Sequence, residues 1–285
     1  MTPVALIVNW NAGTHLLDCV RSLQAEGVTD IVVADNGSTD GSLRDLAAAE
    51  PSVVAFETGA NLGFGGGVNR AAARSADLGE GCDLLVLNPD VVMGPGSVKA
   101  MMAAAESTAR VGVVGPRIDT PDGMLYPSAR TFPSLRDSIG HAFLGMVWPT
   151  NPFTRRYRML DWDHGQRGDV DWVSGSCFLI RAAAWRDVEG FDEAYFMYAE
   201  DVDLCWRVRR AGWDVVYEPE AVVVHVQGLS TSRRPYRMIA AHHRSLLRFA
   251  IKTTTGVERL LLPLMAVGLG ARTVLAWVHH RFSRG

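Results

Sequence analysis

Residues 4–35 read VALIVNWNAGTHLLDCVRSLQAEGVTDIVVAD, and the order of apolar and polar residues in this segment indicates the architecture. An apolar, largely β-branched run (4–8) precedes a segment from His15 to Gln24 with apolar residues at helical spacing, and a second apolar run (31–34) follows. A strand, a helix and another strand in this order predict a parallel, doubly wound sheet with helices on its faces.

The same alternation continues along the chain. We expect helices at 42–49 and 68–76 and strands at 53–56 and 84–87. Segment 116–171 is rich in Pro, Arg, Trp and Tyr and lacks clear periodicity, so it predicts long loops, which are usually functional in a compact domain. Beyond it we expect a strand at 172–180, helices at 182–187 and 200–210, a strand at 222–226, and basic helices after Tyr236. The predicted class is α/β, with one domain at 1–234 and a helical tail at 235–285.

The composition excludes several classes of protein. The 285 residues carry a formal net charge of -3, whereas a dedicated nucleic-acid binder needs a strong basic excess, so we expect no nucleic-acid partner. The four cysteines are scattered without a CxxC pair, which argues against a zinc knuckle or a disulfide framework. The first ten residues lack a basic segment followed by a long apolar one, so we expect no secretory signal.

The tail differs in charge from the rest of the chain. From Arg233 onward ten Lys and Arg residues accompany one acidic residue, Glu258, and an apolar run of twelve residues (260–271) ends at Arg272. A bilayer crossing needs about 20 apolar residues. We therefore expect helices that lie on an anionic membrane surface, peripheral to the cytoplasmic face of the plasma membrane. The alternative is that these helices pack on the domain or form a homodimer interface.

Polar residues follow the predicted strands at their carboxyl ends, where open α/β sheets bind ligands. Asn9 and Asn11 follow the first strand, and Asp35 follows the second. An Asp at such a position can accept hydrogen bonds from a ribose or from the N–H edge of a pyrimidine, so we expect Asp35 to contact a ligand. Asn88 and Asp90 follow the strand at 84–87. A carboxylate there, together with substrate phosphates, would hold Mg²⁺ or Mn²⁺.

The segment NLGFGGGVN (61–69) is rich in glycine but does not match the dinucleotide-binding pattern G-x-G-x-x-G, because Val68 occupies the sixth position. The first predicted strand also lacks the glycine turn of such a site. Two interpretations stay open. Asn61 and the glycines, Gly65 among them, could allow the backbone to approach a nucleotide, or the glycines could let a helix pack closely.

Two further groups of residues can carry chemistry. EDVD (200–203) opens a predicted helix, where the helix dipole stabilises carboxylates, but three acids after an aromatic stretch also suit a general base in a partly apolar pocket. Successive helical residues point about 100° apart, so Glu200 and Asp201 cannot face an acceptor equally, and Asp203 should point away. His225 ends a predicted strand, and hydroxyl residues with Arg233 and Arg234 follow it, which favours a metal and diphosphate site.

Together these residues resemble glycosyltransferase family 2, inverting enzymes with the GT-A fold, and within it the bacterial rhamnosyltransferase branch. The segments that carry the resemblance, in the family's order, are VNWN (8–11), DNGSTD (35–40), NLGFGGGVN (61–69), LLVLNPDV (84–91), VSGSCFLIR (173–181), GFDEAYFMYAEDVDLCWRVRRAGW (190–213) and the strand that ends at His225. They cover nearly all of residues 4–234. The resemblance implies a GT-A domain, a nucleotide-sugar donor and a divalent cation, Mg²⁺ or Mn²⁺.

The resemblance also implies roles for individual residues. Asp35 would contact the nucleobase, and Asp90 and His225 would bind the metal. Asn88 stands where many relatives have the first Asp of a DxD-like motif. Asp201 would be the catalytic base with Glu200 beside it, and Ser174, Gly175 and Ser176 would border the acceptor pocket. The set expected around the nucleotide sugar is Asn9, Asn11, Asp35, Asn61, Gly65, Asn88, Asp90, Arg233 and Arg234.

For substrates, the rhamnosyltransferase branch implies a dTDP-β-L-rhamnose donor and a polyprenyl-diphosphate-linked N-acetylglucosamine acceptor, as used in cell-wall polysaccharide assembly. One alternative is a family 2 transferase with another donor, UDP-galactofuranose or another UDP-hexose. A nicotinamide-dependent oxidoreductase can share this type of sheet, but the missing glycine turn argues against it. A noncatalytic, membrane-bound assembly factor is the third alternative, and the presence of Asp35, Asp90, Asp201 and His225 argues against that.

Overall fold

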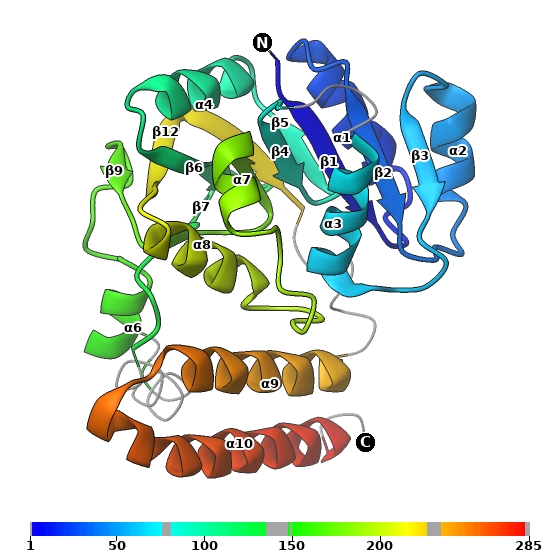
Figure 1. Cartoon of the computed structure of the whole chain (residues 1–285). Helices are drawn as coiled ribbons and strands as arrows, with labels where there is room; N and C mark the ends of the chain where they lie inside the picture. The colour runs from blue at the N-terminus through cyan, green and yellow to red at the C-terminus, as the bar shows by residue number, and fades with distance from the viewer. Residues whose placement is uncertain (1, 76–80, 135–147, 149, 227–234, 283–285) are drawn as a thin grey trace.

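The computed structural model describes residues 2–75, 81–134, 148, 150–226 and 235–282. One large sheet forms the centre, helices cover both of its faces, and two long helices lie along one side of the molecule (Figure 1). The α/β class and the mostly parallel sheet predicted from the sequence are confirmed, because the strands on the main path of the sheet run in one direction with two exceptions.

The order of strands in the sheet is β3-β2-β1-β4-β11-β6-β12-β5. The bounds are β1 (Val4–Asn9), β2 (Ile31–Asp35), β3 (Val54–Glu57), β4 (Leu84–Leu87), β5 (Val91–Met93), β6 (Val111–Asp119), β11 (Cys177–Ile180) and β12 (Asp214–His225). β11 is antiparallel to both β4 and β6, and β5 is antiparallel to β12. The carboxyl ends of β1, β4 and β12 therefore meet on one side of the molecule, as the predicted ligand site requires.

Two hydrophobic clusters pack against the two faces of the sheet. Along β1, Leu6 and Val8 belong to one cluster and Ala5 and Ile7 to the other, since successive strand residues point to opposite faces. Helices α3 (Gly63–Ser75), α7 (Ala182–Asp187) and α8 (Glu200–Arg210) contribute to the first cluster, and α1 (His15–Ala25), α2 (Ser42–Ala49) and α4 (Ser97–Glu106) to the second. Burial on both faces explains why the strands are continuous apolar runs.

Several boundaries differ from the sequence expectations. The strand predicted at 172–180 is two strands in different sheets, β10 (Trp172–Val173), which pairs with β8, and β11 of the main sheet, because a Ser-Gly-Ser turn separates them. Segment 116–171 is not only loops. It contains the end of β6 and the elements β7 (Leu125–Tyr126), β8 (Ala129–Arg130), α6 (Pro152–Tyr157) and β9 (Gly168–Asp169). β12 begins at Asp214, well before the expected 222, and α4, β5 and β6 were not anticipated.

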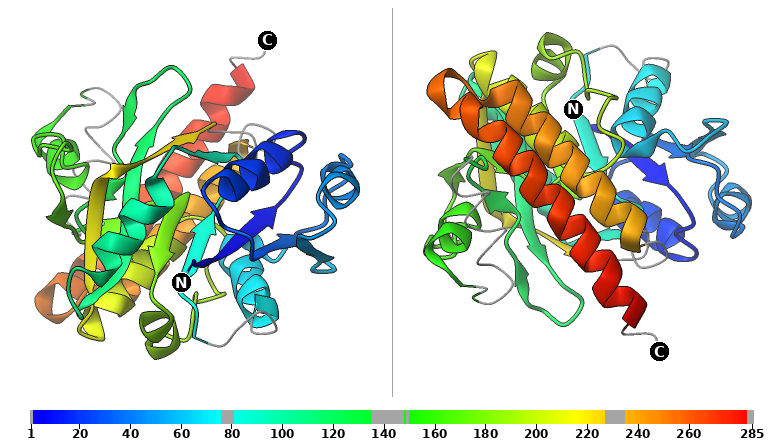
Figure 2. Two further views of the ribbon diagram at one scale, coloured as in Figure 1. Left: turned by 90° about the horizontal axis from the view of Figure 1, so that it is seen from above. Right: turned by 90° about the horizontal axis from the view of Figure 1, so that it is seen from below.

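The tail consists of α9 (Pro235–Thr253), a 3-10 turn η2 (Gly256–Leu261) and α10 (Leu262–Phe282). Figure 2 shows α9 and α10 side by side across the underside of the molecule. Phe249 of α9 is 2% exposed and belongs to the same hydrophobic cluster as the sheet and α8, and Lys252 Nζ donates to Asp203 Oδ1 at 2.6 Å. The division at residue 234 stays a prediction, but in packing α9 is part of the domain core.

Candidate active site

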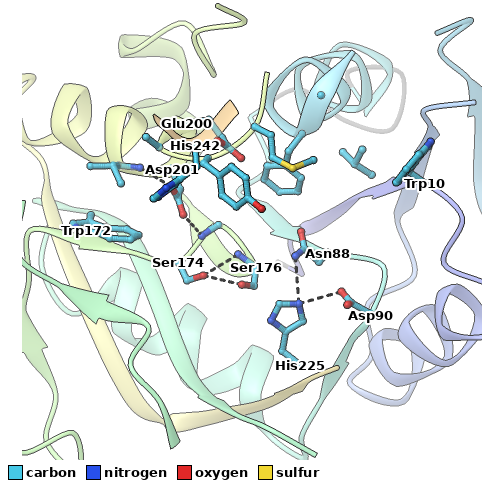
Figure 3. Close-up of a pocket in the computed structure, with 18 of the residues that line it drawn as sticks. Trp10, Asn88, Asp90, Trp172, Ser174, Ser176, Glu200, Asp201, His225 and His242 are labelled. Carbon is cyan, nitrogen blue, oxygen red and sulfur yellow. Dashed lines mark hydrogen bonds and ion pairs between the residues drawn. The ribbon is translucent and has the colours of Figure 1, made fainter. Parts of the chain in front are cut away.

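A cavity of about 440 Å³ opens at the carboxyl ends of β1 and β4. Figure 3 shows its lining as a row: Trp10 at one end, then Asn88, Asp90 and His225, then Ser174 and Ser176, then Asp201, with Trp172 at the other end. The residues come from both halves of the sheet and from the start of α8. Predicted residues far apart in the sequence thus share one cavity.

Asp90 and His225 point at each other at the base of the cavity. His225 Nε2 lies 3.1 Å from Asp90 Oδ1 and 3.4 Å from Asn88 Nδ2. The backbone fixes this arrangement, because His225 pairs with Val91 across β12 and β5, and the N–H of Val226 donates to the carbonyl of Asp90. Both residues are buried, at 7% and 8% exposure for Asp90 and His225.

These residues suit part of the coordination shell of a divalent cation. A carboxylate oxygen and an imidazole nitrogen, both of which can ligate a cation, lie 3.1 Å apart, and the other ring nitrogen, Nδ1, is buried with no partner among the described residues. Within those residues, no group of three or more His, Cys, Asp or Glu side chains is placed to hold a metal. Since Mg²⁺ and similar cations bind through one or two carboxylates plus substrate phosphates, the pair fits a cation that a bound diphosphate helps to hold.

Asp201 and Glu200 begin α8, which starts directly at the cavity wall. The two residues before the helix, Tyr198 and Ala199, have φ values of 67° and 60°, a backbone region that non-glycine residues rarely adopt. This sharp turn directs the amino terminus of α8 towards the cavity. Asp201 Oδ2 accepts from Gly175 N at 2.8 Å, and Oδ1 accepts from Val202 N at 2.9 Å.

The two carboxyl groups differ in acidity. Burial and the neighbouring Asp201 charge raise the pKa of Glu200 to about 8, and its Oε2 atom is buried without a described partner. Burial also raises the pKa of Asp201, but the backbone N–H groups of Gly175 and Val202 and the charge of Arg130 oppose this rise. Asp201 is therefore the more acidic member of the pair, and Glu200, with a pKa of about 8, is the one that holds its proton more strongly.

Asp203 lies away from the cavity, as helix geometry predicts. Its side chain is fully buried, and its carboxylate accepts from Arg207 Nε at 2.7 Å as well as from Lys252. It does not line the cavity, whereas Glu200 and Asp201 do. Of the three acids in EDVD, Asp203 therefore joins α8 to α9.

The Ser-Gly-Ser turn lines the middle of the cavity, where the sequence predicted the acceptor pocket. The hydroxyls of Ser174 and Ser176 are 2.7 Å apart, and both side chains are 8% exposed. The N–H of Gly175 orients the Asp201 carboxylate, and the carbonyl of Ser176 accepts from Asn88 N. This turn therefore connects the part of the cavity that contains Asp201 to the part that contains Asn88 and Asp90.

Asp35, Asn9 and Asn11 build the scaffold behind the site. Asp35 is 2% exposed: its Oδ1 accepts from Asn9 Nδ2 at 2.7 Å, and its Oδ2 accepts from the N–H groups of Gly37 and Ser38. Asn9 is fully buried, and Asn11 Oδ1 accepts from Thr39 N. None of the three lines the cavity, whereas their neighbours Trp10 and Asn36 do. The nucleobase contact of Asp35 stays a prediction, and this network gives the residue a structural role that the sequence did not indicate.

The glycine-rich segment is the start of helix α3 and not a loop, because α3 begins at Gly63, five residues before the expected 68. A Cβ atom on Gly65 would lie 2.9 Å from Phe191 Cβ, and one on Gly67 would lie 2.7 Å from Val8 Cγ1. Of the two open interpretations, helix packing is therefore the one that the structure supports for Gly65. Asn61 and Gly63 do line the cavity.

Several lining residues were not singled out from the sequence. Trp10 lies between the two asparagines that were, and Arg130 with Trp172 comes from segments predicted as a loop and a strand. His242 reaches the cavity from α9, and its ring lies 5.1 Å from that of Tyr198. Position at a strand end could have indicated Trp10, but no local signal marks Arg130 or His242. Arg233 and Arg234 lie outside the described residues.

Comparison with known proteins shows that this chain belongs to the class of glycosyltransferases. Residues 3–244 match the family model described as "Glycosyltransferase like family 2", so the chain belongs to that family. The match extends ten residues into α9, beyond the boundary expected at 234. Family membership confirms the resemblance and sets aside the oxidoreductase alternative.

Two curated relatives share much of the chain. The N-acetylglucosaminyl-diphospho-decaprenol L-rhamnosyltransferase of Mycobacterium tuberculosis (strain ATCC 25618 / H37Rv) is 45% identical over 87% of this chain and 84% of its own length. Rhamnosyltransferase WbbL of Escherichia coli (strain K12) is 30% identical over 68% of this chain and 72% of its own length. Both are named as rhamnosyltransferases.

A solved structure with a similar fold confirms the GT-A architecture. The mannosyltransferase PcManGT from Pyrobaculum calidifontis, in complex with GDP-Man and Mn²⁺, has a TM-score of 0.58 and 15% identity, over 97% of this chain and 75% of that chain. At this identity the similarity concerns the fold alone.

Proposed function

We propose that this glycosyltransferase moves L-rhamnose from dTDP-β-L-rhamnose to a polyprenyl-diphosphate-linked N-acetylglucosamine, with inversion at the anomeric carbon. The observation that carries the proposal is that Asp201 lies on the same cavity as Asp90 and His225. The rhamnosyltransferase with 45% identity supports L-rhamnose as the transferred sugar and the lipid-diphosphate N-acetylglucosamine as the acceptor. The dTDP carrier is what the family resemblance implies. The reaction would serve the assembly of a cell-wall polysaccharide.

The cavity suits a direct displacement. Asp201, the more acidic member of its pair, would take the proton of an acceptor hydroxyl, which attacks the anomeric carbon from the face opposite the nucleotide. The nucleoside diphosphate departs on the side of Asp90 and His225, and no covalent sugar-enzyme intermediate is needed. Glu200, protonated beside the base, would add no second negative charge to the site.

The donor would lie over the Trp10 end of the cavity. Asp90 and His225 are the residues that would hold Mg²⁺ or Mn²⁺, which would stabilise the negative charge on the leaving diphosphate. Trp10, Asn36 and Asn61 line this end and offer an aromatic surface and amides to the nucleoside. By the resemblance, Arg233 and Arg234 would meet the diphosphate, and the Asp35 network would support the wall behind it.

The α9–α10 helix pair would bring the enzyme to the membrane that contains its acceptor. Met265 and Leu269 of α10 pack on α9, while Val267 of α10 is 70% exposed, and Val257 and Leu260 of η2 are 81% and 80% exposed. Apolar side chains on the outer side of this pair are not typical of an amphipathic surface helix, whose outer face is polar. Among the described residues, no helix is long and apolar enough to cross a bilayer. Peripheral attachment to the cytoplasmic face fits these features, and a homodimer through the same residues is the alternative.

The test is to incubate the enzyme with dTDP-, UDP- and GDP-sugars and a short-chain polyprenyl-diphosphate N-acetylglucosamine, and to identify the glycolipid by mass. A deoxyhexose added only from dTDP-rhamnose is the expected result. Transfer of a hexose from a UDP-sugar would replace the donor assignment. No product from any donor, by a protein that binds nucleotide sugars, would favour the noncatalytic alternative.

A further inference from the structure

Arg130 lies in a cage of aromatic rings at the end of the cavity away from Trp10. Its guanidinium carbon is 5.4 Å, 5.7 Å and 5.0 Å from the ring centroids of Tyr126, Tyr157 and Trp172. All four residues line the cavity. Because rings of this kind attract a cation through their faces, the cage holds the guanidinium in one position.

Arg130 and the three rings of its cage come from four separate elements. Arg130 ends β8 and pairs directly with Trp172 of β10, while Tyr126 ends β7 and Tyr157 ends α6. Asn151 caps α6 by accepting from the N–H groups of Phe153 and Thr154. Trp172 is 4% exposed, and its Nε1 donates to the carbonyl of Thr131 at 2.9 Å. A rigid frame thus surrounds a positive charge.

The hydrogen-bond partners of Arg130 within the described residues do not neutralise its charge. Nε donates to the carbonyl of Pro127 at 2.9 Å, Nη2 donates to the Tyr126 hydroxyl at 2.8 Å, and the guanidinium also hydrogen-bonds to Tyr157, and all three partners are neutral. A guanidinium carries five N–H donors, so these bonds do not exhaust it. The charge of Arg130 acts to lower the pKa of Asp201, although burial raises that pKa by more.

The position of the cage relates it to the acceptor. Figure 3 shows Trp172 beyond Asp201, on the side opposite Trp10, while Asp90 and His225 lie between Asp201 and Trp10. A donor whose diphosphate meets Asp90 and His225 leaves the far side of Asp201 to the acceptor. An acceptor that presents a hydroxyl to Asp201 would therefore extend its remaining atoms towards Arg130.

Building on the proposed function, we propose that Arg130 and its aromatic cage bind the phosphoryl group that joins the acceptor sugar to its lipid. A guanidinium is the side chain best suited to two parallel hydrogen bonds with a phosphate. The cage would thereby distinguish a sugar diphosphate from a neutral glycoside. It would also fix the distance between the phosphate and the hydroxyl that Asp201 deprotonates.

The test compares two acceptors that differ only in charge: a short-chain prenyl-diphosphate N-acetylglucosamine and an alkyl glycoside of the same sugar and chain length. Arg130→Gln should lower kcat/KM for the diphosphate acceptor by about 10- to 100-fold, the range of one charge-assisted hydrogen bond, chiefly through KM. The neutral acceptor should change by less than about 3-fold. Arg130→Lys should restore part of the loss, and Arg117→Gln, which alters an arginine paired with Asp119 outside the cavity, should change neither.

A second measurement needs no turnover. Calorimetric titration of geranyl diphosphate, with dTDP saturating the donor site, should show binding to the wild type and much weaker binding to Arg130→Gln. Equal losses on both acceptors, or undiminished geranyl diphosphate binding by a variant with normal thermal unfolding, would overturn the proposal. If the wild type glycosylates neither acceptor but still binds geranyl diphosphate through Arg130, the proposed function fails and the phosphate site stands.

Discussion

Replacing Asp201 with Asn tests the base with little change in shape. Asn can still accept from Gly175 N or Val202 N, but its amide nitrogen must then face the other N–H group, so about one hydrogen bond, worth about 1 kcal/mol, is lost. Removal of the negative charge beside Glu200 offsets part of this cost, because that charge helps raise the Glu200 pKa to about 8. We therefore expect the variant to fold with nearly unchanged stability.

Turnover should fall far more than stability. Loss of a general base typically costs about 10² to 10⁴ in rate, or about 3 to 5.5 kcal/mol of activation free energy. Donor affinity should be retained, because Asp90 and His225 bind at a separate part of the cavity. The assay measures glycolipid formation and, separately, calorimetric binding of the nucleotide sugar, at the same pH for both proteins.

Glu200→Gln is the matched control. It alters the adjacent residue, which is protonated at neutral pH by the reasoning above, so turnover at pH 7 should remain within a few-fold of the wild type. Asp201→Asn with near-normal turnover would remove Asp201 from the mechanism, and a large loss in Glu200→Gln alone would make Glu200 the base. Lost donor affinity in Asp201→Asn would instead indicate a binding role.

Four further changes test other parts of the structure. Chelation should abolish turnover and Mg²⁺ or Mn²⁺ should restore it, whereas full activity of Asp90→Ala in excess chelator would exclude the metal role. Glu200→Gln should gain stability over the wild type as pH rises from about 4.5 to about 8, since the folded-state pKa of Glu200 lies above its unfolded value and the wild type loses stability in that window; a pH-independent difference in chemical denaturation would contradict the raised pKa. Gly65→Ala should lower the free energy of unfolding by about 1 to 3 kcal/mol through its clash with Phe191, whereas Gly270→Ala, in open space on α10, should raise it by up to about 1 kcal/mol; equal effects would refute the packing argument. Val257→Glu with Leu260→Glu should reduce co-sedimentation with anionic liposomes, and Met124→Glu, at an exposed apolar residue of another segment, should not; unchanged sedimentation with a loss of dimers would favour the homodimer.

The elements that the sequence predicted well are those whose pattern depends on local periodicity and burial. α2, α7, α8 and β4 have the predicted bounds, because each presents a regular apolar face or a continuous buried run to the sheet. β6 and the first half of β12 were missed, although both are largely buried. Both strands contain residues that are unfavourable in strands, glycine and proline in β6 and proline in β12, so their sequences do not show a strand pattern. Pairing with neighbouring strands outweighs this local preference.

The site shows a similar division. Asp90, Asp201 and His225 could be predicted because each stands at the end of a strand or the start of a helix and matches a family motif. Arg130 could not, since its role depends on Trp172, 42 positions later, and on two tyrosines from other elements. Asp35 shows the opposite case, a residue whose structural role the sequence does not reveal. Its carboxylate accepts from the N–H groups of Gly37 and Ser38 in the turn that follows it, and only the structure shows these contacts.

The packing of α9 changes how membrane attachment has to be tested. His242 and Leu246 of α9 line the cavity, Ser245 Oγ donates to the carbonyl of Met197 at 2.9 Å, and Phe249 belongs to the domain core. Deleting residues 235–285 would therefore open the cavity and expose core side chains, so lost activity would say nothing about lipid. Substitutions at Val257 and Leu260 avoid this problem, because both side chains are about four-fifths exposed. If α9 forms one wall of the acceptor pocket while η2, between α9 and α10, contacts the membrane, these substitutions should weaken transfer to membrane-embedded acceptor and spare transfer to a water-soluble one.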